Sequence, residues 1–296
     1  MITTAGLRNV DAGHRGAAKA GGYSRAVNPA ALRSLSDGDL DTRTERLTRL
    51  LDRAGDLGDE SAAETLRAFV RDYGSAHRSL FCRAMNRAAA FGDASLEEPL
   101  LAALTDTRYN CQAWAAKGCA ALGFRAAVPD LLEMLHHDQW IAREEAVVAL
   151  GELGDDSTVP ALVPLLRDPA EWMRARSAEA LATIGGDAAL AGLWDEFIHR
   201  RFPRIGYLAS ALALFPPDVV LPRLLDTAAS PDPDQRYWAA VALGSTGDDR
   251  AVPVLERLQA TDRGATVFDG QVRAAAKKAL RTLGRIQKAI AARNAP

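Results

Sequence analysis

A segment of about 31 residues recurs through the second half of this 296-residue chain. Three copies align at once: AVPDLLEMLHHDQWIAREEAVVALGELGDD from Ala127, TVPALVPLLRDPAEWMRARSAEALATIGGD from Thr158 and VVLPRLLDTAASPDPDQRYWAAVALGSTGDD from Val219. A fourth copy begins at Ala251, is interrupted around residues 264–270 and ends as VRAAAKKALRTLG, and a diverged copy over residues 187–217 keeps the register. Recurrence at this period is typical of an array in which each repeat packs on its neighbours.

Each copy predicts two helices joined by a short turn. Leucines at steps of three and four residues give the first helix one apolar stripe, and a Pro near its first turn costs no hydrogen bond. The second helix carries an Arg six residues before an Ala-Leu pair, and a Gly is expected to cap its end. The prolines are Pro129, Pro160, Pro222 and Pro253; the arginines are Arg143, Arg174, Arg236 and Arg273; the glycines are Gly154, Gly185, Gly247 and Gly284. We predict a structural role for Arg143, Arg174 and Arg236, with a turn or an Asp carboxylate as partner.

The composition agrees with an all-helical fold. Ala and Leu dominate the chain and aromatic residues make up 6% of it, a mixture that favours helix because Ala and Leu lose little entropy on entering one. A single pair of such helices cannot bury its own apolar stripe, so the repeats must stack. The sequence therefore predicts an all-α protein, an α-solenoid of about seven stacked helix pairs.

The repeats resemble the short HEAT repeats of the phycobilisome-lyase type. The resemblance rests on the D-x-x-Ala-Val-Pro-x-Leu opening, the W-x-x-Arg or W-x-Arg start of the second helix, and the Ala-Leu-Gly ending. It covers residues 94–284 well and extends weakly back to residue 61. The resemblance implies a superhelix with the second helices on its concave face. Members of this family include bilin lyase subunits, binding scaffolds and, more distantly, alkylpurine DNA glycosylases.

Four segments are expected along the chain. Residues 1–28 form a basic, flexible N-terminal arm, residues 29–60 a helical cap, residues 61–284 the repeat array, and residues 285–296 a basic helix end and tail. The final stretch VRAAAKKALRTLGRIQKAIAARN holds seven cationic side chains and no acidic one. A solvated face on a terminal repeat and a contact with an anionic partner both account for these charges.

The charge, apolar runs and cysteines argue against a nucleic-acid-binding, membrane-spanning or secreted protein. The net charge of −2 gives no attraction to nucleic acid over the whole molecule, and no apolar run is long enough to span a bilayer. The N-terminus lacks the apolar core of a secretory signal. The odd number of cysteines, Cys82, Cys111 and Cys119, without C-x-x-C spacing, indicates free thiols in a reducing compartment. We therefore expect a cytoplasmic protein.

The sequence offers no catalytic motif, metal site or cofactor site. His136, His137 and Asp138 are adjacent, but they lie at an interhelical turn, where exposure to water is the simpler interpretation. The candidate partner-binding residues are solvent-side positions of the second helices. They are Trp140, Glu144, Glu145, Arg176, Glu179, Phe202, Tyr207, Tyr237 and Trp238. Acidic residues gather in the middle repeats and aromatic ones in the next two, although Trp140 and Trp238, like Trp172, could instead pack within the stack.

These positions predict a non-catalytic scaffold that binds a protein or peptide on its concave face. The acidic centre would select a basic segment, and the aromatic residues would hold its apolar side chains. The alternative is a lyase- or chaperone-like subunit that binds a chromophore or other small ligand, with Arg176 or Arg204 pairing with a carboxylate. A DNA glycosylase-like protein is less favoured, because acidic residues at the centre would repel phosphates.

Overall fold

The structure, a computed structural model, describes residues 29–35, 37–55, 60–71, 80, 84, 96–107 and 111–293. The predicted arm over residues 1–28 lies outside these ranges. The chain forms two compact units, Met1–Ala127 (unit 1) and Val128–Pro296 (unit 2).

Unit 1 contains two groups of packed helices. In the first, α2 (Leu40–Gly55) packs on α3 (Glu60–Arg71), and α3 also contacts α1 (Pro29–Ser34). In the second, α5 (Glu97–Thr105) packs on α6 (Gln112–Leu122), which is followed by the 3₁₀ turn η4 (Arg125–Ala127). Leucines fill both groups, among them Leu47, Leu66 and Leu100, which are fully buried. The helix α2 lies within residues 29–60, where the sequence predicts helical structure.

Unit 2 consists of five successive pairs of helices, one for each sequence repeat. In order they are α7 (Val128–Met134) with α8 (Trp140–Leu153), α9 (Val159–Leu162) and η5 (Val163–Arg167) with α10 (Glu171–Ile184), α11 (Gly186–His199) with α12 (Gly206–Leu212), α13 (Pro217–Thr227) with α14 (Pro233–Thr246), and α15 (Val252–Thr261) with α16 (Val272–Arg293). The short turn η6 (Asp249–Ala251) leads into α15. The predicted α-solenoid is therefore confirmed.

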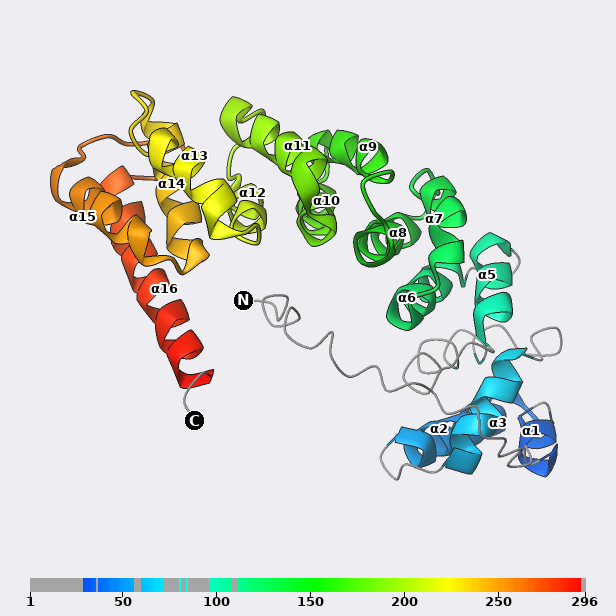
Figure 1. The fold of residues 1–296 in the computed structure, drawn as a ribbon. Coiled ribbons are helices and arrows are strands. Elements are labelled where there is room, and N and C mark those ends of the chain that lie inside the picture. The colour runs from blue at the N-terminus through cyan, green and yellow to red at the C-terminus, as the bar shows by residue number, and fades with distance from the viewer. Residues whose placement is uncertain are drawn as a thin grey trace. The chain divides into compact units, whose positions relative to one another are not determined.

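The second helices of unit 2 pack on one another in a continuous row, which we call the inner row. Helix α8 contacts α10, α10 contacts α12, α12 contacts α14, and α14 contacts α16 (Figure 1). The Ala-Leu pairs of the sequence repeat, such as Ala180 with Leu181 and Ala242 with Leu243, are buried in this row. The inner row is thus the part of unit 2 on which side chains of successive repeats can meet.

Two glycines allow neighbouring helices of the inner row to approach closely. A Cβ atom on Gly151 of α8 would lie 2.8 Å from the Cα of Ala180 on α10, and one on Gly244 of α14 would lie 2.5 Å from the Cα of Ala279 on α16. Both distances are shorter than carbon atoms tolerate, and the atom that would be met belongs to the backbone. Small residues on both sides therefore set the spacing of these helices.

Three details differ from the sequence predictions. Pro222 lies inside α13, which begins at Pro217, rather than at its first turn. Gly284 lies inside α16 and does not end it, because the residues that follow, RIQKAIAAR, are mostly good helix formers. The first helix of the second pair changes to 3₁₀ form at Val163, beside Pro164, which has no N–H to donate to the carbonyl of Pro160.

The insertion before α16 forms a small ordered loop. Ala265 and Gln271 make an isolated antiparallel bridge, which is the only extended pairing among the residues that the structure describes. Thr266 Oγ1 accepts hydrogen bonds from the backbone N–H groups of Asp269 and Gly270, at 2.6 Å and 2.8 Å. These bonds hold Val267 and Phe268 at the exposed tip. None of the described helices is long and apolar enough to cross a lipid bilayer.

Candidate functional site

The repeated arginines hold the turns between paired helices. Nη1 of Arg143 donates to the carbonyls of His137 and Asp138, at 2.7 Å and 2.9 Å, and Nη1 of Arg174 donates in the same way to Asp168 and Pro169. Nη1 of Arg236 donates to the carbonyls of Ser230 and Pro231, in the turn before α14. Their predicted structural role is confirmed in this geometry. Among the described residues, an Asp carboxylate is an additional partner for Arg236 but not for Arg143 or Arg174.

A group of charged side chains joins α8 to α10 on the inner row. Nε of Arg176 lies 2.9 Å from Oε1 of Glu144, and its Nη1 lies 3.0 Å from Oε2 of Glu179. The bond to Glu144 raises the pKa of Arg176, with Glu179 adding to the effect against the cost of partial burial. The three side chains carry one net negative charge, and Glu145 follows Glu144 on the same helix. The structure thus brings three candidate residues together, with Arg176 reducing the acidity that the sequence suggests.

Two tryptophans lie at the start of the same two helices. The rings of Trp140 and Trp172 are 5.5 Å apart between centroids and meet edge to face, with an interplanar angle of 69°. Trp140 remains 56% exposed, and the next residue, Ile141, is also exposed. Exposed aromatic residues of this kind are frequent anchors at protein interfaces. Trp140 therefore combines a packing contact with a large surface that a partner can cover.

Phe202 and Tyr207 surround the buried guanidinium of Arg174. The Cζ atom of Arg174 lies 4.0 Å from the ring centre of Phe202 and 5.9 Å from that of Tyr207. Burial raises the pKa of the Tyr207 hydroxyl, and the neighbouring Arg174 opposes that shift. Both rings are half-buried. Both rings pack mainly at the junction between α10 and α12, and only part of each ring is exposed to solvent.

Tyr237 and Trp238 form a second aromatic pair at the junction of α12 and α14. Their ring centres are 5.1 Å apart and the rings meet edge to face. Tyr237 is half-buried, and burial raises its pKa, with a smaller contribution from Asp269. Trp238 is only 7% exposed, because its ring packs against Gly206 of α12. Trp238 therefore has the packing role that the sequence left open as an alternative.

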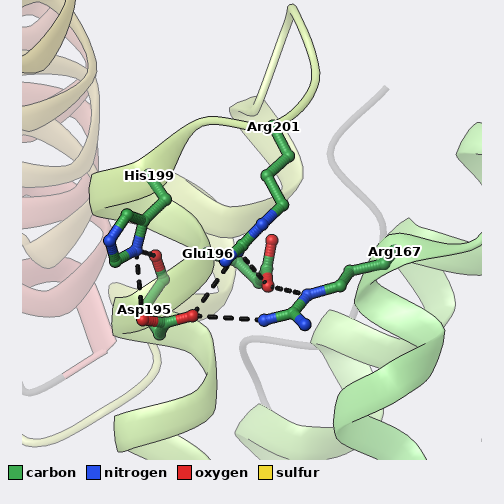
Figure 2. Close-up of polar contacts among 5 residues, drawn as sticks. All are labelled: Arg167, Asp195, Glu196, His199 and Arg201. Atoms are coloured by element: carbon green, nitrogen blue, oxygen red, sulfur yellow. Dashed lines mark hydrogen bonds and ion pairs between the residues drawn. The ribbon is translucent and has the colours of Figure 1, made fainter.

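An ion-pair network on the first helices links η5 to α11 (Figure 2). Glu196 is 3% exposed, and its Oε1 accepts hydrogen bonds of 2.5 Å from both Arg167 and Arg201. The carboxylate of Asp195 forms longer ion pairs with the same two arginines. Its backbone carbonyl lies 2.8 Å from Nδ1 of His199. The bond to Glu196 raises the pKa of Arg201. The network satisfies a buried carboxylate and fixes one repeat to the next.

The pair of histidines in the α7–α8 turn is not arranged as a metal site. His136 is exposed, and Nδ1 of His137 accepts a hydrogen bond of 3.0 Å from the backbone N–H of Gln139. Throughout the described ranges, no three His, Cys, Asp or Glu side chains are placed to share a metal ion. The turn thus has the solvent-exposed character that the sequence favoured.

The free-thiol interpretation of the cysteines is wrong for Cys111. This residue is disulfide-bonded, whereas Cys119 is buried and takes no part in a disulfide. Cys82 lies outside the described residues. The spacing of the three cysteines gave no sign of a bond, because residues far apart in sequence meet only after folding. The cysteines therefore no longer support the expected reducing compartment.

The family of HEAT repeats matches the chain over residues 68–150, 96–182, 138–199 and 206–281. These overlapping ranges cover well over half of the sequence. The chain belongs to the HEAT-repeat family. No curated protein matches it by sequence.

Several solved structures resemble the chain at low sequence identity. An engineered protein is 20% identical over 86% of this chain and 77% of its own, with a TM-score of 0.48. YibA of Escherichia coli is 16% identical over 88% of this chain and 94% of its own, with a TM-score of 0.46. The complex of CpcE and CpcF of phycocyanin lyase from Nostoc sp. PCC7120 is 20% identical over 92% and 98%, with a TM-score of 0.39.

The diverged HEAT repeat differs from its neighbours at the turn between its helices. Ile205 occupies the register of the turn-binding arginine, six residues before Ala211, and is buried. Arg200, at the end of α11, instead joins this turn to the next repeat, because its Nη1 lies 2.5 Å from Oδ2 of Asp234 on α14. Arg200 and Arg204 both have positive φ, at 47° and 58°, which is a strained conformation for residues other than glycine.

Buried polar atoms without a hydrogen-bond partner gather around this diverged repeat. Within the described part of the chain they belong to Arg174, Ser177, Arg200, Asp234, Trp238 and Asp269, that is, to α10, the turn after α11, α14 and the loop before α16. Native proteins leave few such atoms, and each suggests a water, a ligand or a strained contact. Sequence inspection could not find this group, although the missing arginine at Ile205 marks the repeat as unusual.

Proposed function

We propose that this HEAT-repeat protein is a scaffold that binds a basic, partly apolar segment of another protein on the inner row, across α8 and α10. The exposed indole of Trp140 beside Trp172 supports the proposal most strongly. Burial of a tryptophan side chain removes a large apolar area from water, and Trp172 holds the ring from one side. The neighbouring Ile141 extends the same apolar surface.

The charges beside the tryptophans favour a cationic partner. Glu144 follows Trp140 by one helical turn, and Glu171 is exposed next to Trp172. Glu144, Arg176 and Glu179 together retain one negative charge. A Lys or Arg side chain could lie over an indole ring and still reach a carboxylate, an arrangement that combines cation–π attraction with an ion pair. Basic character would speed the encounter, and aromatic contact would prolong the complex.

A peptide library displayed against the full chain tests this function. We expect the selected peptides to combine Lys or Arg with aliphatic or aromatic residues. They should bind Trp140→Ala at least about tenfold more weakly than the unaltered protein, as expected for an interface anchor. Leu214→Ala is the matched control, since Leu214 is similarly exposed outside α8 and α10, and it should bind normally. Selection of acidic peptides, or equal binding to both variants, would contradict the proposal.

A small ligand at the diverged repeat is the second candidate function. It is favoured by the unpaired Nε of Arg174 and Nε1 of Trp238, both on buried side chains near aromatic rings. Arg176 is less suited to a ligand carboxylate than the sequence suggested, because it already pairs with Glu144 and Glu179. A ligand that used Trp238 should bind Trp238→Phe more weakly, while the peptides selected on α8 and α10 should not distinguish that variant.

A further inference from the structure

The last helix of the chain carries cations and no acidic residue. Seven Lys and Arg side chains lie on α16. They are Arg273, Lys277, Lys278, Arg281, Arg285, Lys288 and Arg293, and all seven residues are exposed. The whole chain has a formal net charge of −2, so this helix differs in sign from the rest of the protein.

Six of these cations lie on one side of the helix. With 3.6 residues per turn, the residues from Arg273 to Lys288 fall within an arc of about 140°. The centre of the arc is opposite the buried stripe of Val272, Ala276, Ala279 and Leu283, which packs against α14 and α15. We call these six residues the cationic face of α16. Its position leaves it outside the packed interior of unit 2.

No carboxylate of the described residues pairs with the cationic face. Arg285 donates to Oγ1 of Thr282 at 3.2 Å, and the other five make no hydrogen bond or ion pair with the described residues. Elsewhere in unit 2 arginines are regularly paired, as Arg176 is with Glu144 and Arg236 with Asp262. Among the described residues, a carboxylate contacts α16 at Gln287, which donates to Oδ1 of Asp249 and lies outside the cationic face. Six unneutralised charges along one helix repel each other, and an anionic partner would relieve this repulsion.

We propose that the cationic face of α16 binds an acidic segment of a partner protein. The face extends over about 15 residues, or about 22 Å of helix. An extended peptide rises by about 3.3 Å per residue, so about seven residues would cover it. The absence of acidic residues from α16 provides the charge complementarity, and the lack of large apolar side chains in the face indicates a contact made mainly by charge.

Other anionic partners fit the helix less well. The apolar stripe of α16 is buried against α14 and α15, so the helix has no free apolar face to insert into a lipid surface. It has no aromatic residue on which unpaired bases could stack. A long rigid duplex would extend beyond the cationic face, and the rest of the chain is net negative, whereas a short acidic peptide can remain on α16.

This surface is separate from the one proposed on α8 and α10. The two have opposite charge preferences, and α16 contacts α14 and α15 rather than those helices. A failure of either proposal would therefore leave the other standing. Together they would allow the scaffold to hold two segments of opposite charge.

Binding of a fluorescein-labelled peptide with seven consecutive glutamates tests the proposal. The triple variant Lys277→Gln, Arg281→Gln, Lys288→Gln should weaken binding roughly tenfold, since each exposed ion pair contributes modestly. The control Arg223→Gln, Arg257→Gln, Arg263→Gln removes the same charge from exposed positions elsewhere in unit 2 and should change binding less than about twofold. Binding should also weaken as salt is added. Circular dichroism verifies that both variants remain folded.

Three results would overturn the proposal. The first is absence of peptide binding, or an equal loss in both triple variants. The second is tighter binding of a DNA duplex or of vesicles containing phosphatidylserine than of the peptide, which would assign the face to phosphate groups. The third is salt-sensitive self-association that disappears in the α16 variant, which would make a second copy of this chain the partner.

Discussion

Arg236 and Asp262 connect two adjacent repeats through a paired guanidinium and carboxylate. Nε of Arg236 lies 2.7 Å from Oδ2 of Asp262, and Nη2 lies 3.2 Å from Oδ1. Arg236 also donates to two carbonyls of the turn before α14. The Asp262 side chain is almost entirely buried. One arginine therefore fixes both its own turn and the end of the first helix in the next repeat.

Replacement of Arg236 by Met should destabilise the protein by about 2–4 kcal/mol. The substitution leaves a buried carboxylate and two carbonyls without their donor, which costs more than the loss of an exposed ion pair. Arg273→Met is the matched control, because Arg273 has the same register in α16 but is exposed, and it should cost less than about 0.5 kcal/mol. Urea denaturation followed by circular dichroism measures both. Equal costs would show that the bonds of Arg236 do not stabilise the array.

The same ion pair predicts a loss of stability in acid. Its bond to Arg236 lowers the pKa of Asp262 below the ordinary value of 3.8. A carboxyl group with a depressed pKa in the folded state stabilises the protein above its unfolded pKa, and this contribution is lost as the pH falls through the folded value. Asp262→Asn should therefore be less stable than the unaltered protein at pH 6, with the difference shrinking below about pH 4. A difference that stayed constant down to about pH 2 would rule out this origin.

Two glycines of one repeat array should respond in opposite ways to alanine. Gly244→Ala places a methyl group 2.5 Å from the Cα of Ala279, and we expect it to cost about 1–3 kcal/mol because α14 and α16 must separate. Gly284 lies inside α16 with no atom near its absent Cβ. Gly284→Ala should thus stabilise the protein by about 0.5–1 kcal/mol. Thermal denaturation of the two variants checks both signs.

Much of the fold could be predicted because the repeat length determines which residues of adjacent repeats are neighbours. Residues about 32 positions apart meet in adjacent repeats, as Trp140 does with Trp172 and Arg176 with Glu144. The turn-binding arginines were predictable for the same reason, since they recur regardless of the surface around them. Their partners are mostly backbone carbonyls, which every sequence supplies and no residue pattern reveals.

The rest depended on local packing that the repeat does not encode. Trp238 is buried because Gly206 of the diverged repeat leaves room for its ring, whereas Trp140, the first residue of α8, stays exposed. The acidic centre is partly neutralised by Arg176, whose side chain could have faced solvent at the same register. The ordered loop with Phe268 at its tip follows from hydrogen bonds to Thr266, an interaction specific to one insertion.

Charge changes around Arg176 should slow or speed the association of a basic segment, depending on their sign. Glu144, Glu145 and Glu179 against Arg176 give −3 + 1 = −2, and Glu144→Lys with Glu145→Lys changes this sum to +2. Association of the basic peptides selected on α8 and α10 should then slow about tenfold at low salt, with little change in dissociation, because charge acts mainly on the encounter. Arg176→Gln changes the sum to −3 and should speed association instead. Arg176 is partly exposed, so its loss should cost little stability.

Stopped-flow fluorescence of labelled peptides at two salt concentrations measures the association of both variants. If the double Lys variant bound its peptides more tightly, or if both variants changed association in the same direction, charge selection of a basic segment would have to be abandoned. Tighter binding of an anionic small molecule to the double Lys variant would then favour the ligand-binding alternative.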